Sequence, residues 1–457
     1  MTFTSFWAFL VTLGVLIVVH EYGHYRVAVA CGVKVLRFSV GFGRVLWRRQ
    51  ASADHTEFVV SVLPLGGYVR MLDEREGPVP THLLGQAFNR KALWQRTAIV
   101  AAGPLANLLL AVLLYAASHW IGVDEPKALL SKPATASLAE RAGMRSGDWV
   151  RAWTDEDGQW QDVSSLSDLG WQVTQHALQR KPITLSITDT RGQGQRQVVL
   201  PLDQLETQEI DAAAMKRIGL GAPFSEPVLG EVKTGGPAAV AGLHAGDRVL
   251  RVDDVPIGDA FQLRELISGA VSGRTARTMQ WRVERQGQVM DFAVTPRVVG
   301  EGERKVGRVD IVPGQPPAMV TVRLGPVEGL YRGAVRTWEV SMLSLRMLGR
   351  MLIGQASVRN LSGPLTIADY AGQSVNLGLA YYLGFLALVS VSLGVLNLLP
   401  LPMLDGGHLM YYLFEGLTGR PVSDLWLARL QRGGIAVLLA MMSVALFNDV
   451  ARLLGLH

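Results

Sequence analysis

Long apolar runs constrain this chain more than any other feature of its sequence. A helix needs about 20 largely apolar residues to cross a lipid bilayer, and the 457-residue chain has several such runs separated by polar stretches. Only 18% of the residues are charged, against roughly a quarter in soluble proteins. This composition excludes disorder and argues against an ordinary cytosolic enzyme. We therefore predict a polytopic α-helical membrane protein with four transmembrane helices, at residues 1–30, 97–123, 372–407 and 425–448.

The charges between these runs predict how the chain crosses the membrane. Residues 25–96 hold eleven Lys/Arg against five Asp/Glu, and such an excess is typical of a cytoplasmic loop. With loop 31–96 on the cytoplasmic side, both termini and the large segment after the second helix lie in the periplasm. A cleaved export signal is the alternative for the first run, because residues 28–31 resemble a cleavage or lipid-attachment site. The lack of positive charge before His20 argues against it.

The large segment after the second apolar run contains strand-like alternation and a weak internal repeat. Residues 136–150 and 238–249 share a short helix, a Gly, an apolar residue, Gly-Asp and a strand. This pattern resembles the PDZ domain of bacterial proteases, so we expect two inserted β-rich PDZ-like domains, at 124–215 and 216–320. The resemblance places the peptide groove of the second domain, which would add a peptide to a sheet edge, at Ile218, Gly219 and Leu220. The alternative is a pair of inert spacers.

A charged and Leu/Met-rich stretch follows the two PDZ-like domains. Residues 326–368 begin with Arg and Glu residues spaced three or four apart, with apolar residues on the other faces. This spacing predicts an amphipathic helix. Two interpretations are equally open. The helix lies on the outer membrane face with its basic residues at the lipid headgroups, or it packs on the PDZ-like domains.

The motif His20-Glu21-Tyr22-Gly23-His24 lies near the cytoplasmic end of the first apolar run. Residues four apart share one face of a helix, so both imidazoles reach one metal ion while Glu21 lies beside it. At about 1.5 Å per residue, His20 is roughly 25 Å into a hydrocarbon layer about 30 Å thick. Ionisable groups at that depth are costly unless they are paired or bound to a metal. The alternative is two histidines satisfied by backbone carbonyls.

A hydrolytic zinc site takes three protein ligands and leaves one position for water. The third ligand is therefore expected from another ionisable residue at membrane depth. The segment 397–408 has two candidates, and we favour Asp405 over its rival His408. Pro400 and Pro402 interrupt the helix there, and Gly406-Gly407 are expected to keep the backbone irregular. Irregular backbone at this depth is tolerated only where protein or water covers it, which suits a cavity around a metal.

Together, His-Glu-x-x-His in the first helix and Asn-x-x-Pro-x-Pro-x-x-Asp-Gly at residues 397–406 resemble the site-2 proteases. Members of that family are intramembrane zinc metalloproteases, and the two inserted PDZ-like domains resemble its RseP-type branch. The resemblance implies one Zn²⁺ per chain, held by His20, His24 and Asp405. It also implies that Glu21 is the general base.

The same resemblance implies residues that bind the substrate. Asn397, with Pro400 and Pro402, would hold the substrate backbone near the metal. Loop 31–96 would form a membrane-associated β-hairpin whose edge faces the substrate, with close approach at Gly43, Gly66 and Gly67. A transmembrane helix must be unwound before it is cut, and an edge strand replaces the hydrogen bonds it loses. A plain turn is the alternative for Gly66-Gly67, and Asn107 in the second run is expected to pack rather than catalyse.

These features predict an inner-membrane zinc endopeptidase whose active site lies within the membrane near the cytoplasmic side. The resemblance suggests single-pass substrates in regulated intramembrane proteolysis: an anti-sigma factor after a first periplasmic cleavage in an envelope stress response, and remnant signal peptides. The PDZ-like pair would admit only trimmed substrates. Membrane lipids are the other expected partners, and no nucleic acid is. Two other functions stay open: a metal-dependent scaffold without proteolysis, and a metal transporter.

Overall fold

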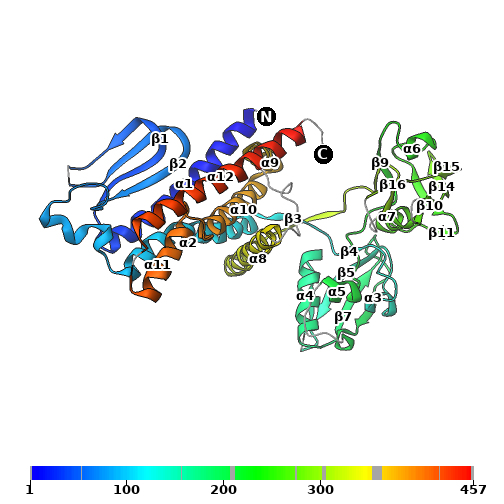
Figure 1. Cartoon of the computed structure of the whole chain (residues 1–457). Helices are drawn as coiled ribbons and strands as arrows, with labels where there is room; N and C mark the ends of the chain where they lie inside the picture. Colours follow the sequence, from blue (N-terminus) through cyan, green and yellow to red (C-terminus); the bar gives the residue numbers. More distant parts are fainter. Residues whose placement is uncertain are drawn as a thin grey trace. The chain divides into compact units, whose positions relative to one another are not determined.

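The computed structural model describes residues 3–52, 54–155, 157–205, 212–272, 275–300, 305–352, 363–420 and 422–453. The chain forms two compact units. One unit combines residues 1–123 with 323–457, and the other is the inserted segment 124–322. Figure 1 shows the helices and strands of both units.

Four helices of the first unit are long and apolar enough to span a membrane, among the residues described. They are α1 (Phe3–Ala30), α2 (Leu93–Ile121), α10 (Leu379–Leu398) and α12 (Asp424–Leu453). Helix α2 is central, since α1, α8, α10 and α11 all pack on it. The prediction of a polytopic helical protein with four spanning helices is confirmed.

The third predicted span, 372–407, is wrong in its limits, because the chain breaks twice within it. Helix α9 (Pro364–Leu377) ends before Gly378, whose φ of +117° favours glycine, and α10 begins at Leu379. After α10 an irregular segment, residues 399–404, precedes α11 (Asp405–Thr418).

The expectation that Gly406-Gly407 are irregular is also wrong, since both lie in the first turn of α11. They are needed there for space. An added Cβ at Gly406 would lie 2.2 Å from the Leu399 carbonyl oxygen, and one at Gly407 would lie 2.3 Å from that of Leu401. The irregular segment 399–404 therefore folds back against the start of α11.

Loop 31–96 contains a sheet built from two long antiparallel strands, β1 (Val35–Arg49) and β2 (Glu57–Met71), followed by the short helices η1 (Thr81–Gln86) and η2 (Phe88–Arg90). Each strand bends, so that Val40 pairs with Gly67 on one side and with Val60 on the other. The last part of β2 is consequently an edge segment, with no second strand partner among the described pairings. This edge segment packs against α1.

Helix α8 (Pro326–Leu352) is the predicted amphipathic helix, and it packs on α2 and α10. Its Val340 joins a buried cluster with Ala111 and Tyr115 of α2 and Val391 of α10. Neither interpretation of the stretch 326–368 anticipated this packing on the spanning helices. Residues 353–362 of that stretch lie outside the described residues.

The inserted unit contains two β-rich modules, each with its own core. The first core runs from Ala128 to Leu220 and the second from Leu229 to Val309. The first module orders its sheet β4-β5-β7-β8, with β6 on β5, and the second orders its largest sheet β11-β10-β14-β15. The pair β3–β19 brings the two ends of the unit together.

The strands of this unit are β3 (Val123–Pro126), β4 (Leu129–Leu130), β5 (Asp148–Thr154), β6 (Trp160–Asp162), β7 (Ile183–Thr188), β8 (Arg196–Leu200), β9 (Leu229–Val232), β10 (Arg248–Val252), β11 (Val255–Pro256), β12 (Val271–Ser272), β13 (Thr275–Ala276), β14 (Met279–Arg285), β15 (Gln288–Val294), β16 (Arg297–Val299), β17 (Val306–Arg308), β18 (Ile311–Pro313) and β19 (Met319–Val322). Its helices are α3 (Leu138–Arg141), α4 (Leu166–Leu178), η3 (Leu202–Gln204), α5 (Ala212–Ile218), α6 (Pro237–Val240) and α7 (Ala260–Gly269).

The predicted repeat is present in both modules. Helix α3 leads into β5, as α6 leads into β10, and the Asp of each Gly-Asp pair accepts a hydrogen bond from a backbone N–H three residues earlier. Asp148 then pairs with Arg196, and Asp247 pairs with Arg285. The two arginines come from opposite arms of the following hairpin, β8 in one module and the end of β14 in the other.

The predicted groove residues Ile218, Gly219 and Leu220 belong to the first module, so their assignment to the second is wrong. Ile218 and Leu220 are buried in the first core. Gly219, with φ +74°, lies so close to Ser137 that an added Cβ would be 2.2 Å from the Ser137 Cβ. The chain after α5 also pairs with β4, since Ser131 donates its N–H to the Ala222 carbonyl. The boundary predicted at 215/216 therefore cuts through the first core.

Candidate active site

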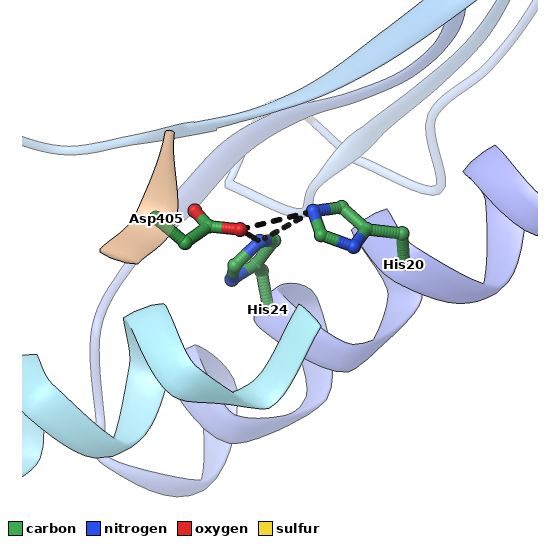
Figure 2. Close-up of side chains that lie close together, drawn as sticks. All are labelled: His20, His24 and Asp405. Atoms are coloured by element: carbon green, nitrogen blue, oxygen red, sulfur yellow. Dashed lines mark hydrogen bonds and ion pairs between the residues drawn. The ribbon is translucent and has the colours of Figure 1, made fainter. Parts of the chain in front are cut away.

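Three side chains from two distant parts of the sequence meet beside α1. His20 and His24 lie four residues apart on α1, and Asp405 is the first residue of α11 (Figure 2). The Asp405 Oδ2 atom lies 3.2 Å from His20 Nε2 and 3.5 Å from His24 Nε2. The two Nε2 atoms are 3.2 Å apart. The three side chains are only 12%, 10% and 19% exposed.

The spacing of these atoms fits a zinc ion. Zinc binds imidazole nitrogen and carboxylate oxygen at about 2.0–2.1 Å with tetrahedral geometry. Two ligand atoms on a tetrahedron of that size are roughly 3.3 Å apart, and the observed separations are 3.2, 3.2 and 3.5 Å. The chemistry also fits, since two imidazoles and one carboxylate are a ligand set of hydrolytic zinc sites. The rival ligand His408 is not in this group.

Helix α2 forms the wall behind the two imidazoles. Its residues Ile99, Gly103 and Asn107 are four apart and so share one face, matching the spacing of the histidines. The Ile99 carbonyl accepts a hydrogen bond from His24 Nδ1 at 2.8 Å. Gly103 leaves room for the His24 ring, because an added Cβ would lie 2.2 Å from its Nε2 atom. Asn107 Nδ2 is 3.3 Å from His20 Nδ1.

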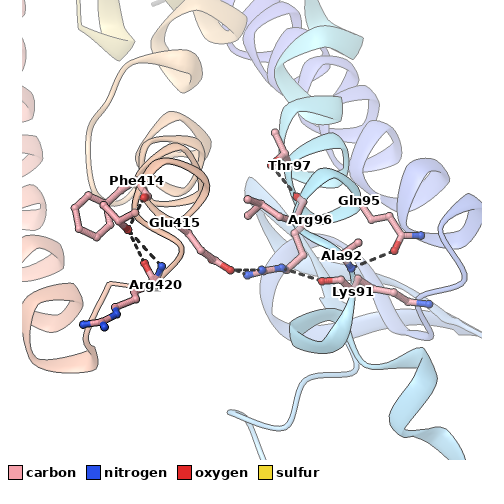
Figure 3. Close-up of polar contacts among 10 residues, drawn as sticks. Lys91, Ala92, Gln95, Arg96, Thr97, Phe414, Glu415 and Arg420 are labelled. Atoms are coloured by element: carbon pink, nitrogen blue, oxygen red, sulfur yellow. Dashed lines mark hydrogen bonds and ion pairs between the residues drawn. The ribbon is translucent and has the colours of Figure 1, made fainter.

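Helix α11 is held to α2 at its far end, which fixes the direction from which Asp405 approaches. Arg96 of α2 makes two hydrogen bonds to the Glu415 carboxylate, at 2.6 and 3.2 Å (Figure 3). Its Nε atom donates to the Lys91 carbonyl, and its guanidinium lies 5.1 Å from the centre of the Tyr412 ring. A bidentate Arg–carboxylate pair restrains orientation as well as distance. The Arg96–Glu415 pair therefore positions α11.

A cavity of about 670 Å³ opens beside His24 and Asp405. It reaches from Glu21, His24 and Asp405 to the Arg96–Glu415 pair. His408 lines this cavity and packs edge-to-face on Tyr411 at 5.9 Å between ring centres. The cavity is polar and large enough to hold water molecules. Water can therefore occupy the space next to His24 and Asp405.

Glu21 lies between the three side chains and the edge segment of β2. An added Cβ at Gly67 would be 2.8 Å from the Ser39 carbonyl oxygen of β1, 2.9 Å from the Glu21 Cγ and 3.0 Å from the Ile17 Cγ2. The absence of a side chain at Gly67 thus brings the sheet edge against the carboxylate. Gly66 has a different neighbour, the half-exposed Phe42 ring. Gly43, with φ +88°, lies farther along β1, where an added Cβ would be 4.0 Å from the Leu63 Cδ1.

The second substrate-binding element of the prediction lies apart from the cavity. Asn397 is in the last turn of α10 and does not line the cavity. Pro400 and Pro402 lie in the irregular segment 399–404. Pro402 packs on α12, where a Cβ added to Gly434 would be 3.1 Å from the Pro402 Cβ. A substrate role for these three residues stays a prediction.

Sequence reasoning missed three contributors to the site. The sequence pattern predicts a packing role for Asn107, and it indicates no role for Gly103 or for the Arg96–Glu415 pair. One signal was available, because positions 99, 103 and 107 have the same four-residue spacing as the two histidines. No pattern in the sequence links Arg96 to a residue more than three hundred positions away.

The fold and the site define a multi-pass membrane protein with a candidate metal centre inside its helical unit. The model of peptidase family M50 matches residues 8–441 of this chain. The Escherichia coli (strain K12) protein named regulator of sigma-E protease RseP is 37% identical over 456 residues, covering 98% of each chain. A Salmonella typhi regulator of sigma E protease and a Yersinia pestis protease RseP are both 38% identical, over 455 and 457 residues and with 98% coverage of each chain.

The chain therefore belongs to peptidase family M50, the site-2 protease family, and is a zinc metalloprotease.

Proposed function

We propose that this chain is an intramembrane endopeptidase that cleaves single-pass membrane proteins, with one Zn²⁺ per chain held by His20, His24 and Asp405. The observation that carries the proposal is the meeting of these three side chains at the ligand spacing of zinc. The helix that carries both histidines is itself long and apolar enough to cross the membrane. The chemistry would therefore take place at membrane depth.

Bound zinc supplies a polarised scissile carbonyl and a water molecule of lowered pKa. Glu21 follows His20 directly on α1 and lines the cavity, so it can receive the proton of that water. It then delivers the proton to the leaving amine as the peptide bond breaks. The edge segment of β2 lies against Glu21 through Gly67. It would bind the unwound substrate as an added strand and align the scissile bond.

The names of the relatives support a proposal for the substrate class. Proteins that share full-length similarity with this chain are named regulators of sigma-E protease. We infer that this chain acts on an anti-sigma factor already trimmed in the periplasm, and on remnant signal peptides. Its location would be the inner membrane, with the inserted unit and both termini in the periplasm, since the loop at 25–96 is rich in Lys and Arg.

The direct test is cleavage of a single-pass substrate by the full-length protein in detergent, beside the variant Glu21→Gln. We expect Glu21→Gln to bind zinc and to fold like wild type but to lose cleavage by about 10³-fold or more, because the general base is gone. A chelator should abolish wild-type cleavage, and added zinc should restore it. Undiminished cleavage by Glu21→Gln would overturn the role of Glu21.

The same preparation separates the two other functions. A scaffold would bind periplasmic peptides without cutting any substrate. A transporter would move zinc across reconstituted vesicles without hydrolysis. Either result with zinc-loaded wild-type protein would contradict the proposed protease.

The inserted unit is proposed to act as a size filter for substrates. Its two compact modules lie between the second and third spanning helices in the sequence. A variant lacking residues 124–320, shown to fold and to bind zinc, should then cut substrates whose outer domains are still attached. If such untrimmed substrates stay uncut, the filter account is wrong.

A further inference from the structure

Asn107 of α2 is a completely buried polar residue, and only one of its two amide heteroatoms has a hydrogen-bond partner. Its Nδ2 atom faces His20 Nδ1 at 3.3 Å, whereas its Oδ1 atom has no hydrogen-bond partner among the described residues. A buried acceptor without a donor costs folding free energy. Such an atom in a native site calls for a functional explanation.

The protons on the two histidines are set by their partners on α2. A backbone carbonyl can only accept, so His24 Nδ1 carries a proton toward the Ile99 oxygen. In the neutral ring, His24 Nε2 then keeps a lone pair that can bind a metal ion. His20 differs, because an amide can present either a donor or an acceptor to its Nδ1 atom. In the orientation seen here the amide NH₂ group faces His20 Nδ1 and can only donate. A neutral His20 ring then carries its proton on Nε2, the atom that faces Asp405 and His24.

That arrangement is suitable only for the metal-free site. For His20 to bind zinc through Nε2, its proton has to be on Nδ1. The NH₂ group of Asn107 and the protonated Nδ1 atom would then be two donors facing each other. A half-turn of the amide brings Oδ1 to the same place and converts the contact into an Nδ1–H···Oδ1 hydrogen bond.

We propose that Asn107 is a positioning residue that selects the tautomer of His20 by rotating its amide when zinc binds. This inference rests on the proposed zinc site at His20, His24 and Asp405. The rotation leaves Nδ2 without a partner in place of Oδ1. The tautomer of His20 therefore decides the orientation of the Asn107 amide. It explains why an amide is placed here, since aspartate can only accept and leucine can do neither. Partners of this kind typically change metal affinity 10- to 100-fold.

The test is zinc affinity of the full-length protein in detergent, measured by competition with a chelator. Asn107→Leu, of similar volume but without hydrogen bonds, should bind zinc 10- to 100-fold more weakly. Asn107→Asp keeps the acceptor and should stay within about threefold of wild type. The matched control is Ser390→Ala, which removes a hydrogen bond to the backbone oxygen of Asn107 and not to its side chain. It should leave the affinity unchanged.

A purely structural role for Asn107 gives a different pattern. Asn107→Leu would then lower the melting temperature of the metal-free protein without weakening zinc binding, and that result would overturn the proposal. So would an equal loss of zinc affinity in Asn107→Asp and Asn107→Leu. If Asn107→Leu does not fold, Asn107→Ala is measured in its place with the same expectation. Failure of the zinc site itself is recognised separately, because His20→Ala would then bind zinc as well as wild type.

Discussion

Replacing Gly103 by alanine adds one methyl group, which should greatly weaken zinc binding at the site. The added Cβ would lie 2.2 Å from His24 Nε2, the atom that faces Asp405. Non-bonded heavy atoms normally stay about 3.5 Å apart, so the imidazole has to move by roughly 1.3 Å. The His24 Nδ1 atom is hydrogen-bonded to the Ile99 carbonyl of α2, the helix that also carries Gly103. This bond limits where the ring can move.

A displacement of that size is large for a metal ligand, since ligand distances tolerate only about 0.2 Å. We expect Gly103→Ala to lose zinc affinity by at least about 100-fold, or roughly 2.8 kcal/mol. Cleavage should fall by a similar factor at limiting zinc. Both are measured on the purified full-length protein, by chelator competition and by hydrolysis of a single-pass substrate.

The control for this substitution is Gly14→Ala, on the helix that carries the histidines. An added Cβ at Gly14 has no neighbour within 4 Å, so zinc binding and cleavage should match wild type. If Gly103→Ala retained zinc and cleavage at the wild-type level, the close packing of α2 behind His24 would be wrong.

Two further predictions concern the sheet edge and the inserted unit. Gly67→Ala should reduce kcat/KM about 10- to 100-fold at normal zinc content, because the methyl group pushes the edge segment away from Glu21. The methyl group of Gly66→Ala contacts only the Phe42 ring, which can move, so this variant should cut substrate nearly normally. Equal losses in the two variants would refute this prediction. Burial acts to raise the pKa of Asp247, but hydrogen bonds from Arg285 and from a backbone N–H hold that pKa below its usual value. Because the folded-state pKa is lowered, the stabilisation is present above about pH 4 and is lost as the pH falls through the folded value. Asp247→Asn should destabilise the second module by about 2 kcal/mol at pH 7 and by less near pH 3, as measured by hydrogen exchange in β14. The same loss at both pH values would contradict this prediction.

Much of the site could be predicted from the sequence because strong physical constraints act on few residues. Ionisable side chains in lipid-immersed helices must be paired or bound. That constraint indicated His20 and His24 together with either Asp405 or His408, and the resemblance to the site-2 proteases favoured Asp405. The structure brings His20, His24 and Asp405 together. The four spanning helices follow from length and apolar composition in the same way.

The contacts between helices could not be predicted, because a helical period does not say which faces meet. Both lipid and helix neighbours favour apolar residues, so the face of α2 that carries Gly103 and Asn107 resembled a packing surface. The start of α11 shows the same limit. Gly406 and Gly407 indicated irregular backbone, yet both lie in the first turn of α11. The preceding carbonyls approach too closely there for any residue with a side chain.

The error at Ile218–Leu220 has another cause. The resemblance to a PDZ domain assigned this segment to the start of the second module, because the second copy of the repeat follows it in the sequence. In the structure the segment closes the core of the first module, next to β4 at the other end of that module. A core completed by its two chain ends cannot be recognised from sequence neighbours alone.

The central claim is that two distant segments, α1 and the start of α11, hold one metal ion together. The most direct measurement is the zinc content per chain of purified Asp405→Ala beside His408→Ala, after dialysis against a weak chelator. We predict that His408→Ala retains one zinc per chain and Asp405→Ala retains almost none. Full zinc content in Asp405→Ala, or its loss only in His408→Ala, would contradict the account.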